Sequence, residues 1–173
     1  GMEKMPQTFT RGYSAYPGGH FLSYELSSGK FEDLIIAPNG EGILTMTMDE
    51  ARGHIYAISW PRGNFLHFDV EKNKLFNLGP ISAAGEAGTP GNDYRVLCRS
   101  MFIDPQNGDV YFSNAEGDIF RFSRNESGFR KMNDVNLRLD YFGQYDPSMP
   151  GSMGYNWRKI FWHPEEEVAY GVH

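Results

Sequence analysis

Two arginines occupy matching places in the sequence, and together they have the chemistry of an anion-binding site. Arg99 stands five residues before Asp104, and Arg158 stands five residues before His163. Two guanidinium groups side by side bind a carboxylate or a phosphate through paired N–H donors. The alternative for each arginine is a structural salt bridge to a nearby acidic residue. The pair is the sharpest binding-site hypothesis that the sequence offers.

A second group of candidate binding residues falls in a long segment without a strand pattern, residues 133–155. Asp140, Tyr141 and Tyr145 lie there, together with Arg138. Aromatic rings beside carboxylates and an arginine suit a sugar or another small polar ligand. The alternative is a surface loop whose rings cover the strands beneath it.

The histidines form no recognised metal motif. His20, His54, His67, His163 and His173 include neither an H-x-x-x-H spacing nor an H-E-x-x-H sequence. The chain also has no Gly-x-Ser-x-Gly and no Walker motif. No cofactor is therefore indicated, and a divalent metal is expected only if the protein is an enzyme.

Composition narrows the class of protein. The 173 residues are 40% hydrophobic and 15% aromatic, with 20 Gly and 10 Pro, which favours an all-β domain rich in turns. A net charge of −6 argues against nucleic-acid binding, and no apolar run is long enough to span a membrane. The single Cys98 cannot form an internal disulfide and is expected to be a buried thiol.

Short strands that recur along the chain must position these residues. Residues 49–56 and 104–111 share an Asp, a Gly four positions later and a Tyr seven positions after the Asp, and 163–170 is a degenerate copy. The strand that follows recurs as well, at 20–24, 64–68 and 118–122. Four short strands per repeat are typical of a β-propeller blade. The connections vary, and we expect the Gly-rich segment 79–93 to be flexible.

With these repeats the chain resembles the superfamily of propellers that includes gluconolactonase-like, streptogramin-lyase-like and NHL-type proteins. The resemblance covers residues 20–173 and implies the fold. A gluconolactonase-like activity would need a Glu, Asn and Asp set around a metal, for which Glu86, Glu116, Asn114 and Asn156 are too few and too scattered. A streptogramin-lyase-like activity would need a His and a Glu near a metal, and His173 and Glu116 are candidates by position.

The predicted fold is all-β, a partial β-propeller ring of about three four-stranded antiparallel blades, two of them complete and two present as half-blades. Residues 1–19 are an irregular lead-in in which Gly1 is typical of a cloning remnant. The blades are assigned to 20–36 (half), 43–79, 94–133 and 156–173 (half). Closed propellers usually need four or more blades. We therefore expect a fragment of a longer ring that self-associates through its open blade edges.

Function is expected on the loop face, where the second-to-third-strand loops and the connections between blades meet. The predicted role is binding of a small polar molecule or carbohydrate. The alternatives are a metal-assisted lyase or lactonase with part of its site missing from this chain, and a protein-interaction platform. The candidate ligand-binding residues are Arg99, Arg158, Tyr141, Asp140, Tyr145, Asn156, Trp60, Asn114, Glu116 and His173.

Overall fold

The computed structural model describes residues 16–82, 85–89, 92–140 and 155–172. In this part of the chain helix is confined to a 3-10 turn at Pro38–Gly40 and to the single turn α1 (Leu137–Asp140), and the rest of the regular structure is strand. The all-β prediction is confirmed. None of the described helices is long and apolar enough to cross a membrane.

The first four-stranded sheet is an antiparallel meander in which each strand pairs with the next, in the order β3-β4-β5-β6. Its strands are β3 (Gly42–Asp49), β4 (His54–Trp60), β5 (Asn64–Asp69) and β6 (Lys74–Pro80). The turns need left-handed backbone, which glycine adopts without strain and asparagine tolerates. Gly53 has φ +69°, Gly63 has φ +74° and Asn73 has φ +48°.

The second four-stranded sheet repeats the first. It contains β9 (Phe102–Ile103), β10 (Val110–Ser113), β11 (Asp118–Phe122) and β12 (Phe129–Asn136), again with neighbours paired in chain order. Tyr56 of β4 lies opposite His67 of β5, and Tyr111 of β10 lies opposite Arg121 of β11. The repeated tyrosine therefore has the same register in both sheets. The last strand extends three residues beyond the expected blade end at 133.

Three two-stranded sheets complete the described structure. Two of them are hairpins at either end of the chain, formed by β1 (His20–Glu25) with β2 (Lys30–Ile36) and by β13 (Lys159–His163) with β14 (Val168–Val172). The third overlaps the segment 79–93, which was expected to be flexible, and pairs β7 (Ala87–Thr89) with β8 (Asn92–Arg95).

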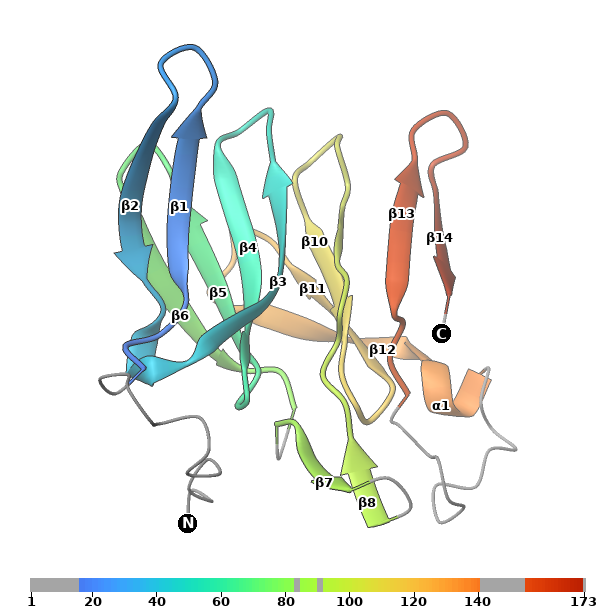
Figure 1. The fold of residues 1–173 in the computed structure, drawn as a ribbon. Helices are drawn as coiled ribbons and strands as arrows, with labels where there is room; N and C mark the ends of the chain where they lie inside the picture. Colours follow the sequence, from blue (N-terminus) through green and yellow to red (C-terminus); the bar gives the residue numbers. More distant parts are fainter. Residues whose placement is uncertain (1–15, 83–84, 90–91, 141–154, 173) are drawn as a thin grey trace.

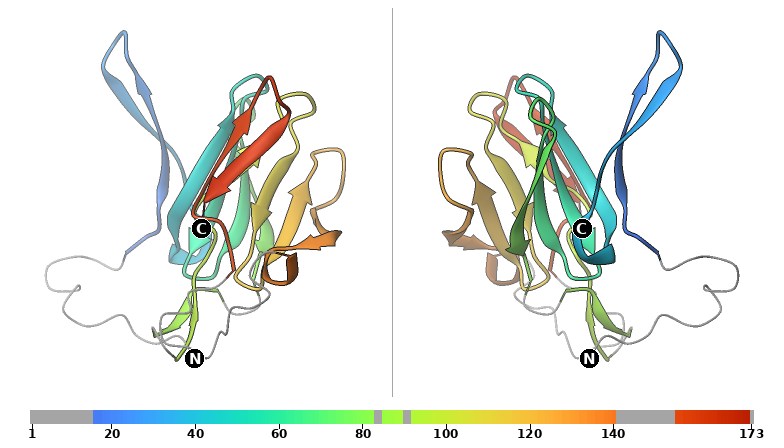
Figure 2. Two further views of the ribbon diagram at one scale, coloured as in Figure 1. Left: turned by 90° about the vertical axis from the view of Figure 1, so that its right-hand side faces the viewer. Right: turned by 90° about the vertical axis from the view of Figure 1, so that its left-hand side faces the viewer.

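The sheets lie in sequence from the β1–β2 hairpin at one side of the molecule to the β13–β14 hairpin at the other (Figure 1), and Figure 2 shows the same arrangement from its two ends. Apolar side chains hold neighbouring layers together. Phe21 of β1 packs on Phe68 of β5, with ring centroids 5.3 Å apart. Phe65 stacks on Phe112 of the second sheet at 4.4 Å, and that sheet contacts β13 where Phe102 stacks on Trp162 at 5.9 Å.

Two apolar cores result from this packing. The smaller core fills the space between the β1–β2 hairpin and the first sheet, and the larger one joins the two complete sheets and extends to β13. Cys98 belongs to the larger core and is fully buried, as predicted. Its burial raises the pKa of the thiol.

Candidate functional site

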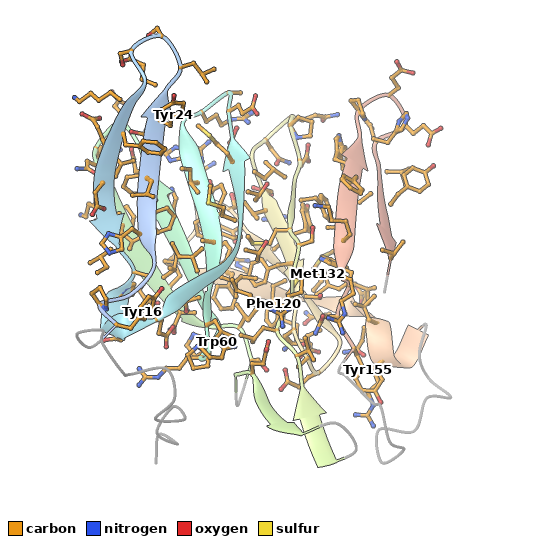
Figure 3. The ribbon with its side chains drawn as sticks, viewed as in Figure 1. Tyr16, Tyr24, Trp60, Phe120, Met132 and Tyr155 are labelled. Atoms are coloured by element: carbon orange, nitrogen blue, oxygen red, sulfur yellow. The ribbon has the colours of Figure 1, made fainter. Side chains whose placement is uncertain are left out.

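The expected binding residues that the structure describes lie mainly at one end of the sheets. This end holds the β4–β5 turn, the β10–β11 turn and the connections that lead to β9 and β13. Trp60, at the end of β4, is partly exposed and precedes a cis peptide bond to Pro61. Figure 3 shows Trp60 and Tyr155 at this end and Tyr24 toward the other. We call it the loop end of the sheets.

Arg99 forms an ion pair at the loop end. Its Nη2 lies 3.0 Å from both carboxylate oxygens of Glu86. The same carboxylate accepts a hydrogen bond from the amide of Leu97, and the Glu86 amide donates to the carbonyl of Pro61 at 2.8 Å. This is the salt-bridge alternative, and it ties the β7–β8 hairpin to the β4–β5 turn. Arg158 is half-buried, and its amide donates to the carbonyl of Val172. Joint anion binding by the two arginines stays a prediction.

Asn114 and Glu116 organise the β10–β11 turn. Asn114 is buried, and its Oδ1 accepts hydrogen bonds from the amides of Glu116 and Asp118 at 3.1 and 2.8 Å. This is the local side-chain-to-backbone bonding that asparagine provides in turns. Glu116 accepts hydrogen bonds from the hydroxyl of Ser82 at 2.9 and 3.0 Å, which connects the turn to the end of β6.

Replacing Gly117 in this turn with alanine is expected to lower the free energy of unfolding by more than the same change at Gly128. Both glycines have left-handed backbone, with φ +87° and +82°. A Cβ at Gly117 would lie 2.7 Å from the backbone nitrogen of Arg138, whereas a Cβ at Gly128 would meet nothing within 4 Å. Gly128→Ala therefore measures only the backbone strain, about 1–2 kcal/mol. Urea denaturation of both variants gives the difference, and equal losses would contradict the close contact.

The remaining candidates either join segments or lie outside the described structure. Asn156 is buried, and its Nδ2 donates to the carbonyl of Val96, so it ties the segment before β13 to the segment before β9. Asp140 is the last residue of α1. Tyr141, Tyr145 and His173 lie outside the described residues, so neither the aromatic loop nor the His173–Glu116 pair is tested.

A buried carboxylate that the sequence did not single out also lies at the loop end. Glu41 precedes β3, and its Oε2 accepts hydrogen bonds from the side-chain Nδ2 of Asn64 at 2.8 Å and from the hydroxyl of Ser59. The Nε of Arg62 lies 3.4 Å from its other oxygen. The observed carboxylates of this end are therefore held by protein partners. Among the described residues, no three His, Cys, Asp or Glu side chains come together as metal ligands.

A cavity of about 540 Å³ lies at the opposite end, between the two complete sheets. We call it the intersheet cavity. Its walls come from the starts of β4 and β6, the end of β5 and the β11–β12 turn. Its size falls in the range typical of small-molecule sites. The lining residues are His54, His67, Asp69, Lys72, Phe76, Leu78, Phe122, Arg124, Glu126, Ser127 and Gly128.

Two histidines form the polar centre of the intersheet cavity. His54 Nδ1 lies 3.0 Å from His67 Nε2, so one ring donates a hydrogen bond to the other. Burial, followed by the charge of His54, lowers the pKa of His67 to about 4. Burial also lowers the pKa of His54, with Arg124 as the next cause. Both imidazoles are therefore neutral near pH 7, and the hydrogen bond between them leaves the pair with one free N–H donor and one free acceptor nitrogen.

Aromatic rings flank the His67 imidazole on both sides. It stacks on Tyr56 and on Phe76, with centroids 5.0 and 5.4 Å apart. Phe122 of the second sheet approaches to 5.7 Å. The cavity therefore combines apolar ring surface with two neutral hydrogen-bonding groups.

Most charges around the intersheet cavity are neutralised by protein partners. Lys72 lies 2.7 Å from Asp69, and its hydrogen bond lowers the pKa of that carboxyl to about 2. Glu126 forms ion pairs with Arg121 at 2.9 Å and with Arg130 at 2.8 Å. Arg124 is exposed at the rim and has no carboxylate within ion-pair distance among the residues that the structure describes. Among the four charged lining residues, Arg124 is thus the one without an opposite charge at ion-pair distance in the described part of the chain.

No protein-family profile matches the chain, and no curated protein matches it either. The chain is similar in structure to several solved proteins. Two structures of the extracellular domain of BT4673 from B. thetaiotaomicron, described as a one component system and as a hybrid two component system, share 13% and 14% identity with the chain, with TM-scores of 0.51 and 0.52. An auxiliary nutrient binding protein from Bacteroides thetaiotaomicron VPI-5482 shares 14% identity, with a TM-score of 0.46.

These likenesses concern a small part of larger proteins. Each covers 91% of this chain, but the chain spans only 18% of the BT4673 domain and 36% of the nutrient binding protein. At such identity the similarity to BT4673 concerns the fold alone. It shows that this arrangement of antiparallel sheets also occurs within a longer extracellular domain.

Proposed function

We propose that the sheets are blades of a β-propeller and that the protein binds a small organic anion, of the sugar-acid class, in the intersheet cavity. The propeller is supported by the two four-stranded meanders with the same register and by their face-to-face packing. Blades of four antiparallel strands that pack side by side are the unit of this architecture.

The observation that carries the ligand proposal is the combination of Arg124 with the neutral histidine pair. A carboxylate on the ligand would supply the partner that Arg124 lacks among the described residues, and charge-assisted hydrogen bonds of this kind are the strong ones. Hydroxyl groups would bond to His54 and His67, which donate and accept when neutral. The rings of Phe76 and Phe122 would cover the apolar face of the ligand.

This proposal moves the binding site away from the loop end that the sequence favoured. The reason is electrostatic, because Arg99 is already paired with Glu86 whereas Arg124 is not paired with a described carboxylate. Binding an anion at Arg99 would require breaking an existing ion pair. Binding at Arg124 requires only the displacement of water.

Calorimetric titration with glucuronate and glucose tests the proposal, because the two sugars differ by the carboxylate. Glucuronate should bind about 10- to 100-fold more tightly than glucose, since a hydrogen bond to a charged group contributes about 1.5–3 kcal/mol. Arg124→Gln should remove this difference. Arg130→Gln is the matched control, because Arg130 is exposed and pairs with Glu126. Equal affinity for both sugars, or undiminished glucuronate binding by Arg124→Gln, would contradict the proposal.

A further inference from the structure

The β1–β2 hairpin is equivalent to the outer half of a complete sheet. Tyr24 pairs with Phe31 in this hairpin, as Phe68 pairs with Leu75 in β5–β6. The sequence repeat places Tyr24 and Phe68 at the same position. In the complete sheet the inner edge of β5 pairs with β4, whereas the equivalent edge of β1 has no neighbouring strand in the described structure.

The β13–β14 hairpin is equivalent to the inner half. Phe161 pairs with Tyr170, as Thr47 pairs with Tyr56 in β3–β4. In the complete sheet β4 pairs with β5, whereas the equivalent edge of β14 has no neighbouring strand among the described residues. The two hairpins are therefore complementary halves of one four-stranded sheet.

We propose that two copies of this chain complete each other's open sheets, with β14 of one copy paired to β1 of the other. The composite sheet then has the order β13-β14-β1-β2. The register follows from β4 and β5, where Tyr56 lies opposite His67 and Ile58 lies opposite Phe65. The repeat aligns Tyr170 with Tyr56 and Ser23 with His67, so Tyr170 would lie opposite Ser23 in the dimer. By the same alignment Val172 would lie opposite Phe21.

Exposed apolar side chains on β1 support this pairing. Leu22 and Tyr24 are 57% and 51% exposed, whereas their counterparts Leu66 and Phe68 are 0% and 1% exposed. A monomer would leave these large side chains in water, and exposed patches of this kind mark interaction surfaces.

The same contrast holds on β14. Tyr170 and Val172 are 54% and 62% exposed, whereas their counterparts Tyr56 and Ile58 are both fully buried. An open strand edge with apolar side chains is a template for pairing with another chain. The edges that the repeat predicts to pair are thus also rich in exposed apolar groups.

A second exposed surface, on β3 of the first sheet, would also be buried in this dimer. Met46 and Met48 of β3 lie opposite Ala57 and Ile55 of β4, so they share the face of the first sheet that the β1–β2 hairpin covers. Both methionines are nevertheless exposed, at 56% and 45%. The partner's β13–β14 hairpin, joined to β1, would lie over β3 and bury them.

Two copies are the number that closes the assembly. The described residues of one copy form two complete four-stranded sheets and two halves, equivalent to three blades, so two copies supply six, within the usual range of about four to eight. The two hairpins lie at opposite sides of one copy (Figure 1), so they do not pair within it. The closed dimer has the twofold symmetry that is commonest among homo-oligomers.

Light scattering of the 173-residue chain gives the first test. The expected mass is twice the 19.7 kDa of one chain. Tyr170→Lys combined with Val172→Lys should yield a folded monomer, because both side chains are exposed in a single copy and would be buried only in the dimer. Val70→Lys is the control, since Val70 is exposed in the β5–β6 turn and should leave the dimer intact.

Cross-linking tests the register. A Ser23→Cys chain mixed with a Tyr170→Cys chain should give a covalent dimer with a short thiol crosslinker, because directly opposite residues have Cβ atoms about 4.5–5.5 Å apart. Ser23→Cys mixed with Ala169→Cys should not, since neighbouring residues on a strand face opposite sides. The buried Cys98 should not react.

A monomer at all concentrations would overturn the proposal. Filaments or an oligomer larger than a dimer would also overturn it, since pairing β14 of each copy with β1 of the other closes the ring with two copies. A dimer that survives the double lysine change, or that cross-links equally through Ala169→Cys, would show that another surface holds it together and would overturn the pairing of β14 with β1.

Discussion

Replacing Phe65 with alanine is expected to lower the free energy of unfolding by about 3–5 kcal/mol, the range for removing a buried phenylalanine. Phe65 is fully buried between the two complete sheets. Its ring stacks on Phe112 at 4.4 Å and contacts Phe122 and Phe129 at 5.3 and 5.8 Å. Because these rings come from separate sheets, the substitution leaves a cavity that neither sheet alone can fill.

Urea denaturation measures this loss, and Leu26→Ala is the matched control. Leu26 is highly exposed in the β1–β2 turn, so its truncation should change the free energy of unfolding by less than about 0.5 kcal/mol. A loss below about 1 kcal/mol for Phe65→Ala would contradict the tight stacking of the two sheets, since a well-packed site cannot collapse so completely.

Acidification is expected to destabilise the protein through His67. The pKa of His67 is about 4 in the folded state and 6.5 for an unperturbed histidine. Between these values the unfolded chain binds a proton that the folded chain excludes, so the free energy of unfolding falls as the pH decreases from 6.5 to about 4. The loss is on the order of 3 kcal/mol, and below pH 4 this residue adds no further change.

Replacing His67 with phenylalanine removes the titrating group and keeps a ring between Tyr56 and Phe76. The variant should therefore show a flatter dependence of the unfolding free energy on pH between 6.5 and 4. Leu26→Ala serves as the control, because Leu26 is highly exposed in the β1–β2 turn and has no titratable group, so this variant should keep the wild-type slope. A slope unchanged by His67→Phe would contradict the burial of a neutral imidazole at this position.

The strands and their pairing follow from the sequence because local signals and the repeat agree. Alternating apolar residues, turn glycines and the recurring tyrosine mark β4 and β10, and both sheets form with one register. The short strands β7 and β8 are not predicted by the sequence, and the flexibility expected for the segment 79–93 stays a prediction. Its glycine content indicated flexibility, but pairing between strands depends on partners that composition does not reveal.

The candidate site was harder to predict because it depends on contacts between distant segments. The sequence identifies Arg99 as a candidate anion-binding residue, but the spacing of residues along the chain does not reveal Glu86 as its ion-pair partner. The spacing of metal motifs does not single out His54 and His67. The predicted pairing of β4 with β5 could have indicated this histidine pair, since its register places the two imidazoles diagonally across neighbouring strands. Arg124 comes from the other sheet, so only the packing of the sheets brings it to the histidine pair.

The most direct test of the intersheet cavity as the ligand site is the NMR spectrum of the histidine rings and of the Trp60 indole during titration with glucuronate. The proposal predicts that the imidazole signals of His54 and His67 shift with ligand concentration, while those of His20, His163 and the Trp60 indole remain in place. Shifts at Trp60 with unchanged signals from His54 and His67 would contradict it and return the binding site to the loop end.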